Sequence, residues 1–230
     1  MKKQLFIVLG LGMILTLAGC QNVSNNKDVD PRIANNESIE FFSKSGITAC
    51  AAGAATGALA CLVANANNKP LCIAAAAIAG CGIGIGTNAY LDNNRKKYAT
   101  KELQLNAMTA DMQKENANIQ NASKAAKSVI ADDKVKLAQI DKDMKAKRLN
   151  KAAAEKELKG IDANIAALRS NLADMKKHEK NWKDISAQSR QDGIKTAQLD
   201  KQISDMSKQV RSLEQELDSL YGQRTAIKLS

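Results

Sequence analysis

The stretch from residue 92 to residue 230 contains no proline, and its apolar residues recur at alternating spacings of three and four. This spacing gathers the apolar side chains on one face of a helix, and long helices bury such faces against each other. The clearest repeat predicts a coil core made of Leu199, Ile203, Met206, Val210, Leu213, Leu217 and Leu220. The chain is therefore predicted to be all-α, with long antiparallel coiled-coil helices over residues 92–230.

Two breaks interrupt this region. Asn150 is a suitable N-cap for an alanine-rich helix after a break at residues 146–150, and Asp192-Gly193 is typical of a helix C-terminus. We therefore expect two or three long helices that fold back on each other. The alternative is one continuous rod, which at about 1.5 Å per residue would extend roughly 210 Å.

Aromatic residues are scarce, because the chain has only three Phe, three Tyr and one Trp. A core of this length must then be built from Ala, Leu, Ile and Met, as in long helices. Trp182 stands at a position of the apolar repeat, which favours the core over a role as an anchor for a partner. His178, beside Lys176 and Lys177, is expected to be exposed or half-buried.

The first 19 residues have the features of an export signal peptide. Two lysines precede a charge-free apolar run over residues 5–17, which is too short for a stable membrane span. The sequence Leu-Ala-Gly-Cys at residues 17–20 resembles the lipobox of bacterial lipoproteins. The resemblance implies cleavage between Gly19 and Cys20, attachment of diacylglycerol to the Cys20 thiol, and acylation of the new amine. The alternative is an ordinary secretory signal followed by a chance cysteine.

The residue after the cysteine bears on location. Gln21 stands where an aspartate would resemble an inner-membrane retention signal of enteric bacteria, so the resemblance implies the outer membrane, with the protein facing the periplasm. Two or more acyl chains, such as palmitate, hold a protein stably at about 0.8 kcal/mol per buried CH₂. Residues 20–44 are polar and contain Pro31, and they are predicted to form a flexible tether from the lipid.

Residues 45–91 are rich in Ala and Gly, with Lys69 as their only charged residue after Ser45. Two helices that meet at residues 64–69 are predicted, and small residues recur every four positions on each of them, including Gly53, Gly57, Gly80 and Gly84. This pattern resembles the glycine-zipper hairpins of bacterial outer-membrane lipoproteins. Each arm, at about 20 residues, is long enough to span a bilayer. Polar residues dilute its apolarity, so both membrane insertion and a soluble hairpin at the membrane surface stay open.

Four cysteines lie in this hairpin, and the periplasm permits disulfides. An antiparallel hairpin pairs positions of nearly constant sum, which favours Cys61–Cys72 and Cys50–Cys81. The helical phase of 100° per residue does not allow both bridges between two straight helices, so the inner pair is preferred. Free buried thiols and intermolecular bridges are the alternatives. No metal site is predicted, because neither a histidine nor a C-x-x-C pair accompanies the cysteines.

Removal of the signal peptide leaves 32 basic and 24 acidic residues, a net charge of +8, and the whole excess lies after Leu91. Such a surface suits lipopolysaccharide phosphates, anionic lipid or peptidoglycan carboxylates, and the alternative is a solvated, lysine-rich helical surface. Nucleic acid is excluded as a partner for an exported chain that lacks stacking aromatics.

No constellation of catalytic residues is evident. The acidic residues Asp132, Asp133, Glu214 and Glu216 are interpreted as solvated helix faces, and no nucleophile–base pair or phosphate loop occurs. The chain is therefore predicted to have no enzymatic activity and no cofactor.

Two functions are compatible with these features. The first is a structural or interaction lipoprotein of the outer membrane, whose coiled coil associates with itself or scaffolds a partner or envelope assembly in the periplasm. The alternative is a membrane-active module, whose glycine-zipper hairpin oligomerises or permeabilises a bilayer.

Overall fold

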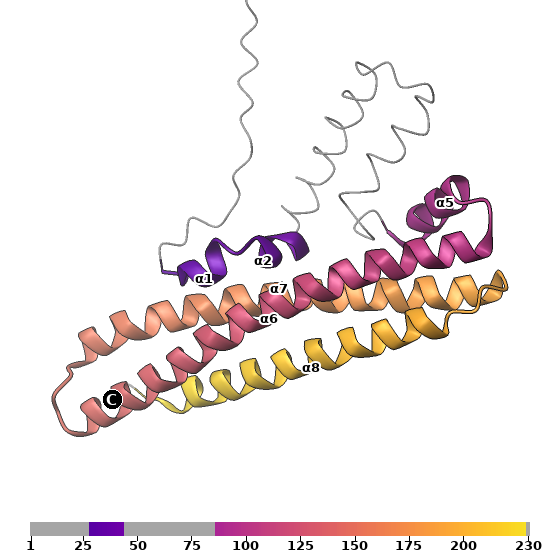
Figure 1. Cartoon of the computed structure of the whole chain (residues 1–230). Helices are drawn as coiled ribbons and strands as arrows, with labels where there is room; N and C mark the ends of the chain where they lie inside the picture. Colours follow the sequence, from indigo (N-terminus) through magenta and orange to yellow (C-terminus); the bar gives the residue numbers. More distant parts are fainter. Residues whose placement is uncertain (1–27, 44–85, 229–230) are drawn as a thin grey trace, which may run out of the picture.

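The computed structural model describes residues 28–43 and 86–228 of the chain, and the described residues form helices without strands. The helices are α1 (Pro31–Ala34), α2 (Glu37–Phe42), α5 (Thr87–Lys97), α6 (Lys101–Lys145), α7 (Lys151–Gln191) and α8 (Ala197–Ala226). The three long helices form an elongated bundle, in which α7 runs antiparallel to α6 and α8, and α6 and α8 run in the same direction (Figure 1). At 1.5 Å per residue, α6 alone extends about 68 Å. The predicted all-α class is confirmed.

The breaks between the long helices fall where the sequence predicted them. Asn150 caps α7, since its side-chain oxygen accepts a hydrogen bond of 2.9 Å from the backbone N–H of Ala153. The turn before it contains Lys147 at a φ of 56°, and Gly193 follows α7 at a φ of 75°, a left-handed conformation that glycine adopts without strain. Because the chain turns back twice, the alternative of one continuous rod is wrong.

The centre of the bundle is apolar where α8 packs against α6 and α7. All seven residues predicted for the coil core between Leu199 and Leu220 are buried. Ion pairs join the helices at the edges of this core, with Arg224 of α8 bound to Asp162 of α7 at 2.8 Å and Lys134 of α6 bound to Glu216 of α8 at 2.8 Å. Exposed pairs of this kind contribute little, so burial of the apolar stripe stabilises the bundle.

Residues 28–43 differ from the predicted flexible tether. Pro31 begins α1 behind the N-cap Asp30, and Asn36 caps α2. Both short helices pack on α6 and α7, where Ile33 and Phe42 are buried. The periodic signal for these helices is too weak to detect, because helices of four and six residues cannot display an apolar repeat. We call residues 28–43 the docked segment.

Helix α5 crosses the predicted boundary between the hairpin and the coiled coil at residues 91 and 92. Tyr90 and Leu91 are buried against the bundle, with exposed fractions of 1% and 3%. This turn of helix therefore belongs to the bundle in structure, although the sequence assigned it to the end of the hairpin. Within residues 28–43 and 86–228, no helix combines the length and the apolar character that a membrane crossing requires.

Candidate functional site

Most of the site residues predicted from sequence lie outside the described residues. These are the cleavage and lipidation residues Gly19 and Cys20, the zipper glycines Gly53, Gly57, Gly80 and Gly84, and the cysteines Cys50, Cys61, Cys72 and Cys81. Lipidation, disulfide pairing and glycine packing therefore stay predictions. The structure instead brings together a set of residues that the sequence did not single out.

Helix α7 carries three buried polar residues at intervals of seven positions, namely Asn164, Asn171 and His178, which we call the polar stripe. Their exposed fractions are 4%, 5% and 3%. Positions seven apart lie on nearly the same helical face, so the three side chains follow one line along α7. This line meets the docked segment, which packs on α6 and α7 (Figure 1).

Asn164 joins the start of the docked segment to α6. Its Oδ1 accepts a hydrogen bond of 2.7 Å from the backbone N–H of Asp30, and its Nδ2 donates one of 2.8 Å to Oδ2 of Asp133. Burial raises the pKa of Asp133, although Asn164 and Lys136 favour its charged form. The prediction that Asp133 lies on a solvated face is wrong, whereas its neighbour Asp132 is exposed and pairs with Arg32 of α1.

Asn171, farther along α7, also joins the docked segment to the bundle. Its Nδ2 donates a hydrogen bond of 3.0 Å to the backbone carbonyl of Ile39. The hydroxyl of Ser38, the residue before Ile39, donates a hydrogen bond of 3.3 Å to Oδ1 of Asn118 on α6. Helices as short as α1 and α2 leave most of their backbone groups without helical partners, and such groups must find other partners when buried. The asparagines of the polar stripe supply some of them.

His178 forms the centre of a buried cluster, contrary to the expectation of an exposed or half-buried side chain. Its Nδ1 lies 2.6 Å from Oε1 of Glu115, and Oε2 of Glu115 accepts a hydrogen bond of 2.9 Å from the indole N–H of Trp182. The side chains of His178 and Glu115 are 3% and 2% exposed. Trp182 is fully buried, in agreement with its predicted place in the core.

Aromatic contacts extend this cluster to the docked segment on one side and to α5 on the other. The Phe42 ring meets the His178 ring edge to face with centroids 5.2 Å apart, and Phe41 stacks edge to face on Phe42 at 4.9 Å. The Tyr90 ring of α5 meets the Trp182 ring at 5.5 Å in the same geometry. Such arrangements are favourable for aromatic pairs. One buried cluster therefore fixes both segments to α6 and α7.

This arrangement is suited to holding a chain segment. Both oxygens of Glu115 are engaged, and Phe42 covers the His178 ring. Among the residues that the structure describes, no group of three or more His, Cys, Asp or Glu side chains is placed to hold a metal ion. A signal for the cluster does exist in the sequence, because three polar residues recur every seven positions directly beside the apolar stripe of α7.

Comparison with known proteins gives no relative from which a role could be transferred. No protein-family model matches the chain, and neither the curated proteins nor the solved structures contain a match.

Proposed function

We propose that this chain is a lipid-anchored structural and interaction protein of the bacterial outer membrane, whose helical bundle holds a partner or an envelope assembly in the periplasm. The observation that carries the proposal is that α1, α2 and α5 all pack on the α6–α7 side of the bundle (Figure 1). These helices border the points at which the described chain continues into residues 1–27 and 44–85. The predicted anchor and the predicted hairpin are thus both attached to one side.

Only a short stretch of chain separates the docked segment from the predicted lipid anchor. Cys20, the predicted lipid attachment site, precedes Asp28 by eight residues, which reach at most about 28 Å when fully extended. Because the docked segment is fixed to α6 and α7 by buried contacts, its attachment would keep the α6–α7 side close to the membrane. Helix α8 would then face away from the lipid.

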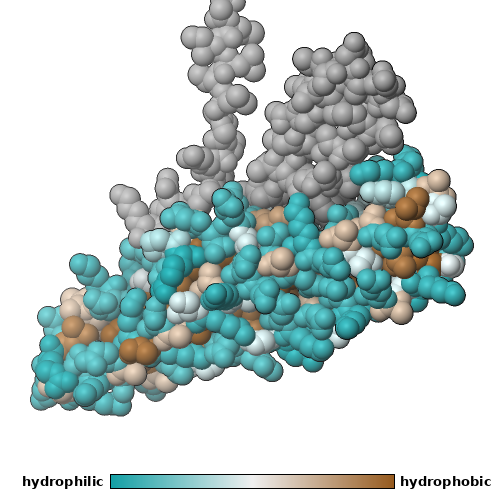
Figure 2. Space-filling model, in the orientation of Figure 1, coloured by the Kyte–Doolittle hydropathy of each residue, from teal (hydrophilic) through white to brown (hydrophobic). Residues whose placement is uncertain are grey.

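The outer face of α8 is polar, and the exposed residues farthest from its buried stripe include Ser204, Lys208 and Gln215. The face of the bundle that Figure 2 shows is mostly hydrophilic. The large hydrophobic side chains that are exposed among residues 28–43 and 86–228 are Leu103, Val135 and Tyr221, on three different parts of α6 and α8. A partner on this surface would be recognised through charges and hydrogen bonds, as at the rim of ordinary interfaces.

The test is site-specific photo-crosslinking of the full-length protein in the producing bacterium. A photoreactive residue at Ser204, Gln215 or Ser219 of α8 should form adducts with another protein or with a second copy of this chain. The matched controls are Asn35 and Lys96, which are also exposed and lie on the docked segment and on α5. Protein adducts from the controls alone, with none from α8, would contradict the proposed orientation.

Lipid attachment is tested separately. Cys20→Ser should abolish incorporation of labelled palmitate and leave an uncleaved precursor, because the thiol alone accepts the diacylglycerol. Incorporation of label into this variant would show that the lipobox interpretation is wrong, whatever the outcome of crosslinking.

A further inference from the structure

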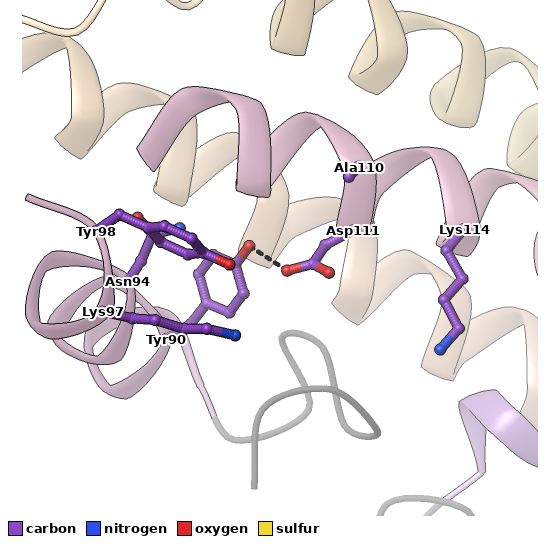
Figure 3. A pocket seen from close by; sticks show the side chains of 7 residues that line it. All are labelled: Tyr90, Asn94, Lys97, Tyr98, Ala110, Asp111 and Lys114. Carbon is purple, nitrogen blue, oxygen red and sulfur yellow. Dashed lines mark hydrogen bonds between the residues drawn. The ribbon is translucent and has the colours of Figure 1, made fainter. Parts of the chain in front are cut away.

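A pocket of about 340 Å³ lies between α5 and the first part of α6, and one of its lining residues, Tyr90, also contacts Trp182 of the buried cluster. Figure 3 shows the side chains that surround the pocket, and these come from α5, from the residue that follows it, and from α6. Those with polar groups are Tyr90, Asn94, Lys97, Tyr98, Asp111 and Lys114. The volume is at the lower end of the range for small-molecule sites and suits a ligand the size of one sugar ring.

Asn94 contributes an unused hydrogen-bond acceptor to this pocket. Its side chain is 5% exposed, and its Nδ2 donates to the backbone carbonyl of Gln104 at 3.3 Å. Its Oδ1 is buried and has no hydrogen-bond partner. An unpaired buried acceptor costs free energy, and a ligand that carries a hydroxyl or an N–H group would remove this cost.

Asp111 contributes a second acceptor. Its Oδ2 accepts a hydrogen bond of 2.7 Å from the Tyr90 hydroxyl, which holds the carboxyl group at the wall of the pocket (Figure 3). Burial raises the pKa of Asp111, and it raises the pKa of Tyr90 far above its usual range, so the phenol stays protonated and donates. The position of the carboxyl group is therefore fixed from behind by Tyr90, which in turn contacts Trp182.

Two lysines and an aromatic ring complete the lining. Lys97 and Lys114 stand on α5 and α6, and the charges of both act on Asp111. The Lys97 ammonium lies 5.3 Å from the centre of the Tyr98 ring. With two ammonium groups against one carboxyl group, the pocket favours a ligand with negative charge.

From this combination we infer that the pocket binds an acidic sugar, that is, a sugar ring that carries a carboxylate or a phosphate group. The ligand's hydroxyl or amide groups would donate to Asn94 and Asp111, its anionic group would pair with Lys97, which lies beside Tyr98 (Figure 3), and the ring would lie against Tyr98. Bare phosphate has no ring to lie against Tyr98, and its O–H groups stand on the same anionic centre that would pair with a lysine, so they would not also reach Asn94 and Asp111. A neutral sugar gains hydrogen bonds from the lysines but no ion pair.

Two sources in the bacterial envelope carry this chemistry: the carboxylated sugar of peptidoglycan and the phosphorylated glucosamine of lipopolysaccharide. The choice of envelope sugars rests on the proposed location, whereas the acidic-sugar chemistry rests on the pocket alone. The experiment uses the full-length protein, purified in detergent. Saturation-transfer NMR measures binding of N-acetylmuramic acid, glucosamine 6-phosphate and the neutral N-acetylglucosamine, and inorganic phosphate serves as a competitor.

At least one acidic sugar should bind roughly tenfold more tightly than N-acetylglucosamine, and equal concentrations of inorganic phosphate should not displace it. The acidic sugar that binds identifies the source. Equal binding of neutral and acidic sugars, displacement by phosphate alone, or no binding of either acidic sugar would overturn the inference. None of these outcomes depends on the crosslinking or palmitate results, so failure of this inference is distinguishable from failure of the proposed function.

Matched variants on α5 locate the site. Lys97→Gln removes one of the two pocket cations and should weaken binding roughly tenfold. Lys96→Gln removes an exposed lysine one position away that does not line the pocket, and it should leave binding unchanged. Asn94→Leu should weaken binding of the sugar further, with circular dichroism used to verify the fold. Equal effects of the two lysine variants would show that binding reflects net charge and not this pocket.

Discussion

Helix α7 is held on two sides by different chemistry. Toward α8 it meets a surface whose seven buried residues are all apolar, whereas five of its own 14 buried residues are polar, including the three residues of the polar stripe that meet the docked segment. The difference follows from the partner. A long helix satisfies its own backbone and needs only apolar contacts, but a segment of two very short helices brings unpaired backbone groups that polar side chains must satisfy.

This contrast predicts that the whole bundle should unfold when charged side chains are introduced into the apolar core on the α8 side. Val210→Asp combined with Leu213→Asp buries two carboxylates without partners in the apolar core, at a cost of more than about 5 kcal/mol, comparable with the total stability of a domain. Circular dichroism of the double variant should show a large loss of helix. Ser204→Asp with Gln215→Asp places the same charges on the outer face of α8 and should retain the parent spectrum.

A double variant that melts like the parent would show that α8 is not required for the bundle. The contrast between the two sides would then lose its basis.

The second prediction concerns the buried cluster below the docked segment. Glu115→Leu leaves Nδ1 of His178 and the Trp182 indole N–H without their partner, and each buried polar group left without a hydrogen bond costs about 1–3 kcal/mol. The loss is measured by denaturant unfolding, followed through the fluorescence of Trp182, the only tryptophan in the chain. Gln113→Leu, at an exposed position of α6, is the control.

Equal unfolding midpoints for Glu115→Leu and the parent would mean that the cluster contributes no stability. In that case the docked segment would be held by the hydrogen bonds of Asn164 and Asn171 and by the burial of Ile33, Ile39 and Phe42.

These two regions also differ in how far the sequence alone predicted them. The α8 side followed from periodicity, because an apolar repeat of three and four determines which face of a helix is buried. The breaks at Asn150 and Gly193 followed from the chemistry of helix ends. For long regular helices, these local rules therefore predict most of the architecture.

The polar side of α7 could not be predicted from the sequence in this way, since local rules treat His178 and Asp133 as residues that prefer water. Their burial depends on partners distant in the sequence: Glu115 lies 63 residues from His178, and the Asp30 backbone lies 134 residues from Asn164. The pocket beside α5 was missed for the same reason, because α5 and α6 bring its residues together only after the chain has turned at residues 98–100.

The third prediction distinguishes detachment of the docked segment alone from unfolding of the whole bundle. Asn171→Ala removes the donor to the Ile39 carbonyl and should destabilise the docked segment by about 1–2 kcal/mol. Hydrogen exchange should then become faster within residues 31–42, while the amides of α8 keep their protection. Ser170→Ala, at the exposed neighbouring position, should change neither. Uniformly faster exchange in all helices would show that the segment and the bundle unfold as one unit.

The smallest expected effects are changes in folding stability with pH. They have opposite signs for the two carboxyl groups beside Asn164, those of Asp133 and Asp30. Burial raises the pKa of Asp133 in the folded protein, so this group contributes stability below its unfolded pKa and loses it as the pH rises through the folded pKa. The hydrogen bond from Arg32 lowers the pKa of Asp30, so its contribution is present above the unfolded pKa and is lost as the pH falls.

Asp133→Asn should therefore gain stability relative to the parent as the pH rises from about 3 to about 7, whereas Asp30→Asn should lose stability over the same interval. Thermal unfolding of both variants and the parent at several pH values measures the two trends. Asn retains the shape of each side chain, so the pH dependence of the difference isolates ionisation from packing. Parallel curves for Asp133→Asn and the parent would mean that the buried carboxyl group ionises as easily as in the unfolded chain, and that Asn164 and Lys136 fully offset its burial.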